Sequence, residues 1–335
     1  MIQQELHSDI LLECGETLHN ARIVFHSSKQ EWNGRNRVIW ICHALTANSN
    51  PEDWWPGMAG EGLAIDTSRD FVVCVNMLGS PYGSEGPATV NPATGKPRLI
   101  DFPPITVRDI VGTLILVRKH LKINTIDLLI GSSIGGFQAI EWAVTEPTVF
   151  RRCLFIATAP RISPYVTATL EAQRMALEAD QSFREAKDIH GGEAGLKCAS
   201  AQALISYRSF EGYALTQADD DPDTVQAQRA ASYERYQGEK LVRRNFDAYS
   251  YYSLCNTMDS QNVGRGRGWV EEALKRIRAI TTVVAIDSDS LFPPLEGRVW
   301  SKYIGGARYI EIPSRFGHDG FLLENSRLGA IIMEK

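Results

Sequence analysis

The chain has 335 residues, a hydrophobic fraction of 44% and a formal net charge of −5, enough for one large core or a core domain with an insertion. This acidic balance gives no reason to expect nucleic acid or an anionic membrane as a partner. The first residues lack the basic and apolar regions of a secretory signal, and no run approaches the roughly 18 apolar residues of a membrane span.

Six short apolar runs predict buried strands. Runs of this kind are typical of strands covered on both faces, as in a parallel sheet. Helical patterns fall between them, at Val107–Leu121 and Gly135–Val144. Strands that alternate with helices predict an α/β protein with a mostly parallel, doubly wound sheet. The predicted strands are Val38–Cys42, Phe71–Val75, Ile126–Ile130, Cys153–Ala157, Thr281–Ile286 and Arg308–Ile312.

Residues from about 160 to 265 break this alternation. They carry helical patterns, such as Thr167–Ala179 and Ala194–Tyr207, and no convincing strand. They could be a run of surface helices. We favour a helical cap inserted at the C-terminal edge of the sheet, where open α/β sheets bind ligands, because the strand pattern resumes afterwards. The prediction is a core domain of residues 1–160 and 266–335 and a cap of residues 161–265. The basic turn Gly264–Gly268 then leads out of the cap.

The strand Ile126–Ile130 is followed at once by a G-x-S-x-G motif and a helix. This order is typical of the α/β-hydrolase fold, in which the sharp turn holds a nucleophilic serine in a strained conformation. Small residues two positions before and after the serine let neighbouring backbone approach. Ser133 has Gly131 and Gly135 at these positions, whereas the adjacent Ser132 has isoleucines. Ser133 is therefore the predicted nucleophile.

A serine hydroxyl needs a base to take its proton and an acid to orient that base. In this fold the chain order is serine, acid, histidine. Of the seven histidines, only His318 follows the last candidate acid. Asp287 and Asp289 both come directly after the strand Thr281–Ile286, and the spacing alone leaves the choice between them open.

Two backbone N–H groups are candidates for the oxyanion hole. One is that of Ile134, directly after the nucleophile, and the other is that of Leu45, in the loop after the strand Val38–Cys42. His43 lies in the same loop and could be mistaken for a catalytic base. Since it precedes the serine and ends a strand, we expect it to pack or to order the loop.

With these residues assembled, the chain resembles the homoserine O-acetyltransferase family of α/β-hydrolase-fold acyltransferases over nearly its whole length. The resemblance identifies the acid, because the family's aspartate immediately precedes an x-Leu-Phe step, as Asp289 does here. The shared motifs are His43–Thr46, Trp54-Trp55, Asn76–Ser80, Tyr82–Ser84, Gly86-Pro87, Asn91-Pro92, Thr94–Pro97, Phe102-Pro103, Thr106–Asp109, Gly131–Gly136, Gln138–Trp142, Gln173–Ala176, Tyr207-Arg208, Ser232–Leu241, Met258-Asp259, Asp289–Phe292 and Gly317–Leu322.

The resemblance implies a ping-pong reaction in methionine biosynthesis. Ser133 would take an acetyl group from acetyl-CoA and pass it to the hydroxyl of homoserine, with His318 as base and acid in turn. The cap would keep water from the acyl-enzyme. The family is typically a homodimer joined through the cap. Acetyl-CoA, or another acyl-CoA, would be a co-substrate, with no permanently bound cofactor or metal. The six cysteines contain no C-x-x-C pair and are typical of reduced thiols in a cytoplasmic protein.

The chain departs from the family where the acceptor carboxylate is bound. The family uses an arginine seven residues before a tyrosine, and here Ser200 stands seven residues before Tyr207. A serine cannot form the bidentate, charge-assisted pair that arginine forms with a carboxylate. Arg208 is kept beside the tyrosine, and so is Asp319, which in the family faces the acceptor amine.

This departure leaves two hypotheses open. Either the acceptor has changed or is bound through another cation, for which Arg161 and Arg315 are candidates, or the chain is a working homoserine enzyme with local drift at Ser200. The donor could also be succinyl-CoA. A serine hydrolase or thioesterase with the same triad, in which water takes the acyl group, is a further alternative, and so is a degenerate interaction module, against which the intact triad argues.

Overall fold

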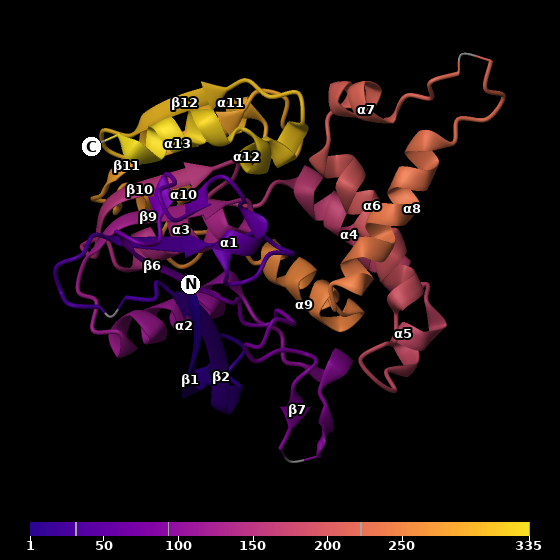
Figure 1. Cartoon of the computed structure of the whole chain (residues 1–335). Coiled ribbons are helices and arrows are strands. Elements are labelled where there is room, and N and C mark those ends of the chain that lie inside the picture. The colour runs from indigo at the N-terminus through magenta and orange to yellow at the C-terminus, as the bar shows by residue number, and fades with distance from the viewer. Residues whose placement is uncertain (31, 93, 222, 335) are drawn as a thin grey trace.

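The computed structural model describes residues 1–30, 32–92, 94–221 and 223–334. Its centre is an eight-stranded sheet in the order β1-β2-β6-β3-β9-β10-β11-β12 (Figure 1). From β6 to β12 every neighbouring pair is parallel. These six strands are the six that the sequence predicts: β3 (Val38–Cys42), β6 (Phe71–Val75), β9 (Ile126–Ser132), β10 (Phe150–Ile156), β11 (Ile280–Ile286) and β12 (Arg308–Ile312).

Two further strands at one edge were not predicted. β1 (Ile2–Leu11) and β2 (Thr17–Ser27) form an antiparallel hairpin, and β2 pairs antiparallel with β6. Most of β1 is exposed or half-buried and carries polar side chains. Such a strand lacks the continuous apolar run that marks a strand of a parallel sheet.

The sheet is covered on both faces, which confirms the predicted doubly wound architecture. Alternate residues of each strand point to opposite faces, so Trp40 packs in one apolar cluster with α2 (Val107–His120) and α3 (Ile134–Thr145), and Ile39 in another with α13 (Asn325–Met333). A capping box of Thr106 and Asp109 begins α2. The shorter elements of this part are α1 (Pro51–Trp54), β4 (Ala59–Gly60), β5 (Ile65–Asp66), β7 (Val90–Asn91), β8 (Lys96–Pro97), α10 (Val270–Leu274), α11 (Pro294–Trp300), α12 (Gly320–Leu323) and the 3₁₀ turns η1 (Leu99–Asp101), η2 (Ser301–Tyr303) and η3 (Gly317–Asp319).

Six helices, α4 to α9, lie between the end of β10 and the basic turn Gly264–Gly268, and no strand is assigned to the described residues of that segment. They gather to one side of the sheet (Figure 1). Gly238 of α8 lets that helix approach α6 closely, because a Cβ there would lie 2.5 Å from the Lys197 carbonyl oxygen. The six are α4 (Pro164–Glu178), α5 (Gln181–Glu185), α6 (Glu193–Tyr207), α7 (Phe210–Gln217), α8 (Arg229–Arg243) and α9 (Ala248–Asp259).

The basic turn after α9 is tied to the sheet domain by ion pairs. Arg265 pairs with Glu13 at 2.5 Å, and Arg267 pairs with Glu141 of α3 at 2.6 Å. Within the described ranges, none of the helices combines the length and the hydrophobicity that a membrane crossing needs.

Candidate active site

Ser133 lies in a sharp turn between β9 and α3. Its φ of 55° and ψ of −129° place a non-glycine residue in a sparsely populated, strained backbone region. Neighbouring backbone holds it there: the Ser133 N–H donates to the Ile156 carbonyl at 3.1 Å, and the Thr158 hydroxyl donates to the Ser133 carbonyl at 2.8 Å. Ile156 ends β10 and Thr158 follows two residues later, so the end of this strand and the residues after it stabilise the strained turn.

The glycines of the motif make this turn possible. A Cβ on Gly131 would lie 2.2 Å from the Gly135 carbonyl oxygen, and a Cβ on Gly135 would lie 2.1 Å from the Cys42 carbonyl oxygen. At Gly136 a Cβ would meet the Thr158 side chain at 2.4 Å. These contacts explain the motif and its register. The first turn of α3, the end of β3 and the Thr158 side chain all lie so close to these positions that only glycine fits.

His318 and Asp289 meet at the C-terminal edge of the sheet. His318 Nδ1 lies 2.7 Å from Asp289 Oδ2, and both residues are buried. The other oxygen of Asp289 accepts from the backbone N–H groups of Leu291, at 2.8 Å, and Phe292, at 3.0 Å. Asp289 is thereby fixed as an acceptor toward the histidine, which leaves His318 Nε2 without a hydrogen-bond partner among the described residues.

Asp287, the other acid that the spacing allowed, is used differently. Its carboxylate accepts the Ser314 N–H at 2.8 Å and so ties the end of β11 to the loop after β12. The histidine loop also depends on a glycine. Gly317 has a φ of 65°, and a Cβ there would meet the Ser209 nitrogen and the Tyr207 carbonyl oxygen at 2.8 Å.

The surroundings of His318 favour its protonated form. Burial by itself lowers the pKa of His318, but the charge and hydrogen bond of Asp289, with the charge of Asp319, outweigh it and raise the pKa above its ordinary value. The rings of Phe292, Phe321 and Tyr207 surround the imidazole at centroid distances of 5.3, 5.3 and 5.7 Å. An imidazole held in this way can accept a proton at Nε2 and keep the resulting charge beside Asp289.

The two N–H groups predicted for the oxyanion hole lie at the ends of neighbouring elements. Ile134 begins α3, where a helix leaves its first N–H groups without internal partners. Leu45 lies in the loop after β3, and neither N–H donates to any acceptor in the described part of the chain. Gln138 of α3 reaches back to the carbonyl of His43 at 3.5 Å, which links the helix to that loop.

His43 bridges this loop to the end of β6. Its Nε2 accepts the Met77 N–H at 3.1 Å, so Nδ1 carries the proton that is donated to the Ala44 carbonyl at 2.9 Å. Burial lowers the pKa of His43 to about 4 despite that hydrogen bond, so the ring is neutral near neutral pH. This agrees with the loop-ordering role expected from the sequence.

One pocket of about 260 Å³, which we call the inner pocket, is lined by all four residues that the sequence places at the acceptor site: Ser200, Tyr207, Arg208 and Asp319. Arg208 lines this pocket, and its Nε forms an ion pair with Asp319 Oδ2 at 2.8 Å. Burial raises the pKa of Asp319, against the lowering effect of Arg208 and His318. The inner pocket is lined by Thr46, Ser200, Ala203, Leu204, Tyr207, Arg208, Gln237, Lys240, Leu241, Arg244, Tyr251, Asp319 and Leu322.

Arg161 and Arg315, the cations predicted from the sequence to replace the absent arginine, do not line this pocket, so that prediction was wrong. Arg315 is exposed and pairs with Glu211 at 3.2 Å, and Arg161 lines a different pocket. The inner pocket instead contains Arg208, Lys240 and Arg244. Nothing in the sequence singled out the last two, because basic residues on a polar helix are typical of a solvated face.

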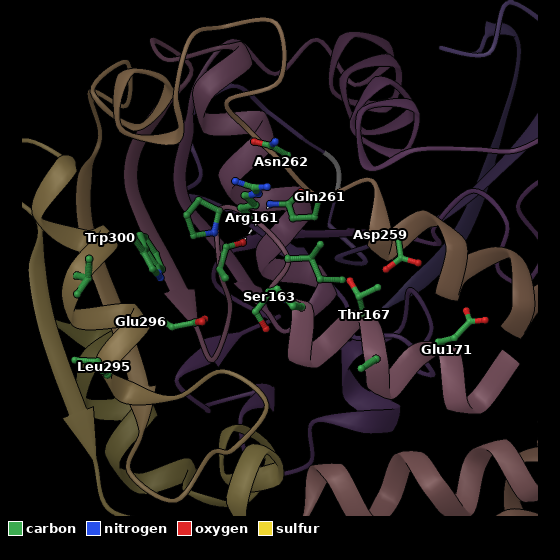
Figure 2. A pocket seen from close by; sticks show the side chains of 16 residues that line it. Arg161, Ser163, Thr167, Glu171, Asp259, Gln261, Asn262, Leu295, Glu296 and Trp300 are labelled. Carbon is green, nitrogen blue, oxygen red and sulfur yellow. Dashed lines mark hydrogen bonds between the residues drawn. The ribbon is translucent and has the colours of Figure 1, made fainter. Parts of the chain in front are cut away.

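The pocket that contains Arg161 has a volume of about 1210 Å³ and lies between α4 and α11 (Figure 2). Its carboxylates are Glu171 and Asp259, which both pair with Arg174, and Glu296. Ser133, Asp289 and His318 are not among its lining residues. They do not line the inner pocket either, but that pocket contains Asp319, which follows His318 in the chain, and Tyr207, whose ring lies 5.7 Å from the His318 ring. We therefore assign the chemistry to the smaller, inner pocket beside His318.

Comparison with known proteins agrees with this architecture. The chain matches a family model described as the alpha/beta hydrolase fold over residues 37–324. It is 39% identical over 321 residues to a homoserine O-acetyltransferase of Cyclobacterium marinum, an alignment that covers 96% of this chain and 91% of the relative.

Solved structures give the same fold. A homoserine O-acetyltransferase from Staphylococcus aureus superposes with a TM-score of 0.81 at 27% identity and covers 99% of this chain and 94% of its own. An esterase superposes with a TM-score of 0.88 at 21% identity and covers 99% of this chain and 98% of its own. The fold is thus shared by proteins named for transfer and for hydrolysis, so fold alone does not separate the two reactions.

Proposed function

Since the chain belongs to the homoserine O-acetyltransferase family of α/β-hydrolase-fold proteins, we propose that it transfers the acetyl group of acetyl-CoA to L-homoserine through Ser133. The observation that carries the proposal is the pairing of His318 with Asp289, at 2.7 Å, beside an inner pocket that contains Asp319. Ser133, Asp289 and His318 act as nucleophile, acid and base. Their chain order and the strained elbow are those expected of this fold.

In the first half-reaction Ser133 Oγ attacks the thioester carbonyl while His318 Nε2 takes the hydroxyl proton. The negative charge that develops on the carbonyl oxygen is stabilised by the N–H groups of Leu45 and Ile134. The carbon–sulfur bond then breaks, and the CoA sulfur leaves with the proton from His318. The products of this step are free CoA and an acetyl ester on Ser133.

In the second half-reaction the acceptor hydroxyl gives its proton to His318 Nε2 and attacks the ester carbonyl. The same two N–H groups stabilise the second oxyanion. Ser133 Oγ leaves and recovers the proton from His318, which returns the enzyme to its starting state. The three aromatic rings around His318 help to keep water from the ester, as a transferase requires.

Acceptor recognition rests on Asp319 and Arg208. Asp319 receives the ammonium group of homoserine, and Arg208, which reaches the same pocket, receives its carboxylate. In this proposal Arg208 replaces the positive charge absent at Ser200, and homoserine remains the acceptor. The pairing of Arg208 with Asp319, at 2.8 Å, supports this proposal. It places side by side a positive charge for the carboxylate of an amino acid and a negative charge for its ammonium group.

The wider setting is part of the same proposal. We assign residues 161–265 to a cap over a core of residues 1–160 and 266–335, and we place the enzyme in the cytoplasm, as a homodimer joined through the cap, in methionine biosynthesis. Its partners are then small molecules, acetyl-CoA and homoserine. Succinyl-CoA as the donor, or another hydroxyl compound or water as the acceptor, would give a different product, which product analysis distinguishes.

Trapping the acyl-enzyme tests the proposal. Mixing the protein with acetyl-CoA alone should add one acetyl group to the peptide that contains Ser133, as measured by mass spectrometry after rapid quenching. Adding homoserine should remove that group and yield O-acetylhomoserine. Ser133→Ala should abolish the modification, whereas Ser132→Ala, one residue away, should retain it. Acetylation that persists in Ser133→Ala would contradict the proposal.

A further inference from the structure

A second pocket adjoins the inner pocket. It has a volume of about 600 Å³, and we call it the outer pocket. Thr46, Lys240, Arg244 and Leu322 line both pockets and so form their common wall. The outer pocket is lined by Ala44, Thr46, Ala47, Asn48, Asp53, Trp54, Pro56, Lys240, Arg244 and Leu322.

Helix α8 supplies the cations of this common wall. Gln237, Lys240 and Leu241 line the inner pocket from one stripe of the helix, and Arg244 continues that stripe at the C-cap. Residues three, four and seven positions apart lie on one face of a helix. The close approach of Gly238 to α6 fixes this face toward the pocket. The four-residue spacing of Lys240 and Arg244 therefore places both positive charges on the common wall of the two pockets.

Neither of these two side chains has an ion-pair partner in the described part of the chain, although both are exposed. This contrasts with Arg208 deeper in the inner pocket, which pairs with Asp319, and with Arg243 next to Arg244, which pairs with Glu239 at 3.8 Å. The only carboxylate that lines the outer pocket within the described ranges is Asp53. The common wall therefore carries two unpaired positive charges toward solvent.

We infer that Lys240 and Arg244 bind the phosphate groups of the acyl-CoA donor at the mouth of the site. The inference rests on the proposed function and names the group that recognises its donor. A CoA thioester is long and carries its phosphates at the nucleotide end, far from the acyl group. A donor that extends from the inner pocket into the outer pocket would therefore leave its phosphates near the exposed common wall. Lysine and arginine are the usual partners of phosphate oxygens. A homoserine carboxylate would instead lie near Arg208, which pairs with Asp319.

The test compares donors with and without phosphates. Lys240→Gln with Arg244→Gln should raise the KM for acetyl-CoA by roughly tenfold, because each exposed charge contributes modestly to binding. The KM for S-acetylpantetheine, which has no phosphate, should not change, and neither should the KM for homoserine. The matched control is Arg243→Gln on the same helix turn, which should leave all three values unchanged.

Direct binding separates a failure of this inference from a failure of the proposed function. Calorimetry with Ser133→Ala needs no turnover: CoA should bind more weakly after the two glutamine substitutions, and pantetheine should bind equally well. Added salt should weaken CoA binding to the parent more than to the substituted protein. Equal CoA affinity in both would overturn the inference, as would a rise in the homoserine KM alone, which would assign the pair to the acceptor carboxylate.

Discussion

At the scale of single residues, the site depends on one histidine whose two ring nitrogens have different environments. Nδ1 of His318 is held by Asp289 at 2.7 Å, whereas Nε2 has no partner among the described residues. Asp319 adds a second negative charge next in sequence, and with Asp289 it raises the pKa of His318 against the effect of burial. The proposed base is therefore influenced by two carboxylates: Asp289 orients its ring, and Asp319 also lines the inner pocket.

This tuning predicts the pH dependence of the first half-reaction. His318 must be neutral to accept the serine proton, so the rate should fall as the pH drops through its raised pKa, with a midpoint above 6.5. Asp319→Asn removes one of the raising charges and should move that midpoint to lower pH. The measurement is the rate of CoA release in a single turnover across a pH series. Glu16→Gln, an exposed charge change elsewhere, serves as control, and an unmoved midpoint in Asp319→Asn would count against the assignment.

A second prediction at this scale concerns Arg208. Arg208→Gln should raise the KM for homoserine about tenfold or more, since it removes a charge-assisted partner of the carboxylate. Acylation by acetyl-CoA alone should be little changed. Arg315→Gln is the matched control, because Arg315 pairs with Glu211 and does not line the inner pocket. If the Arg315 variant lost homoserine affinity and the Arg208 variant kept it, our acceptor assignment would be wrong.

At the scale of elements, the elbow between β9 and α3 was predictable from sequence because its constraints are local. The register of Ser133 follows from Gly131 and Gly135, and the structure explains both by contacts of 2.2 and 2.1 Å that a Cβ would make. The parallel strands were predictable for the same reason, since burial on both faces leaves a continuous apolar run. The edge strand β1 gave no such signal, because it is mostly exposed or half-buried and carries many polar side chains.

The elbow also gives a stability prediction. Gly135→Ala should abolish activity and lower the free energy of unfolding by about 1–3 kcal/mol or more, since the added methyl group overlaps the Cys42 carbonyl. Gly112→Ala is the matched control within helix α2, where a Cβ would meet nothing within 4 Å. That change should be neutral or stabilising by up to about 1 kcal/mol. Urea unfolding followed by fluorescence measures both, and equal effects would contradict this explanation of the motif.

At the scale of the whole molecule, the site combines segments that are far apart in the chain. The inner pocket is lined by Thr46 from the loop after β3, by Arg208 at the end of α6, by Lys240 from α8 and by Asp319 from a C-terminal turn. Sequence patterns could identify Ser133, His318 and Asp319, which stand in recognisable motifs. They could not identify which cations line the pocket, because that depends on how α6 and α8 pack against each other. Arg161 and Arg315, which were predicted from the sequence, lie outside it.

The overall fold does not by itself determine whether the protein transfers the acyl group or hydrolyses it. Esterases and homoserine O-acetyltransferases share this fold, so a nucleophile, a base and an oxyanion hole are common to both reactions. The reactions differ in which hydroxyl reaches the acyl-serine. In our account, the ion pair of Arg208 and Asp319 positions homoserine, and the aromatic rings around His318 disfavour water.

The most direct test of this account is the rate of CoA release from acetyl-CoA, measured with and without homoserine, together with the yields of O-acetylhomoserine and acetate. The account predicts one rapid release of CoA per active site without homoserine, then slow turnover. Homoserine should produce sustained release matched by O-acetylhomoserine. Release of CoA at one steady rate whether or not homoserine is present, with acetate as the product, would contradict it.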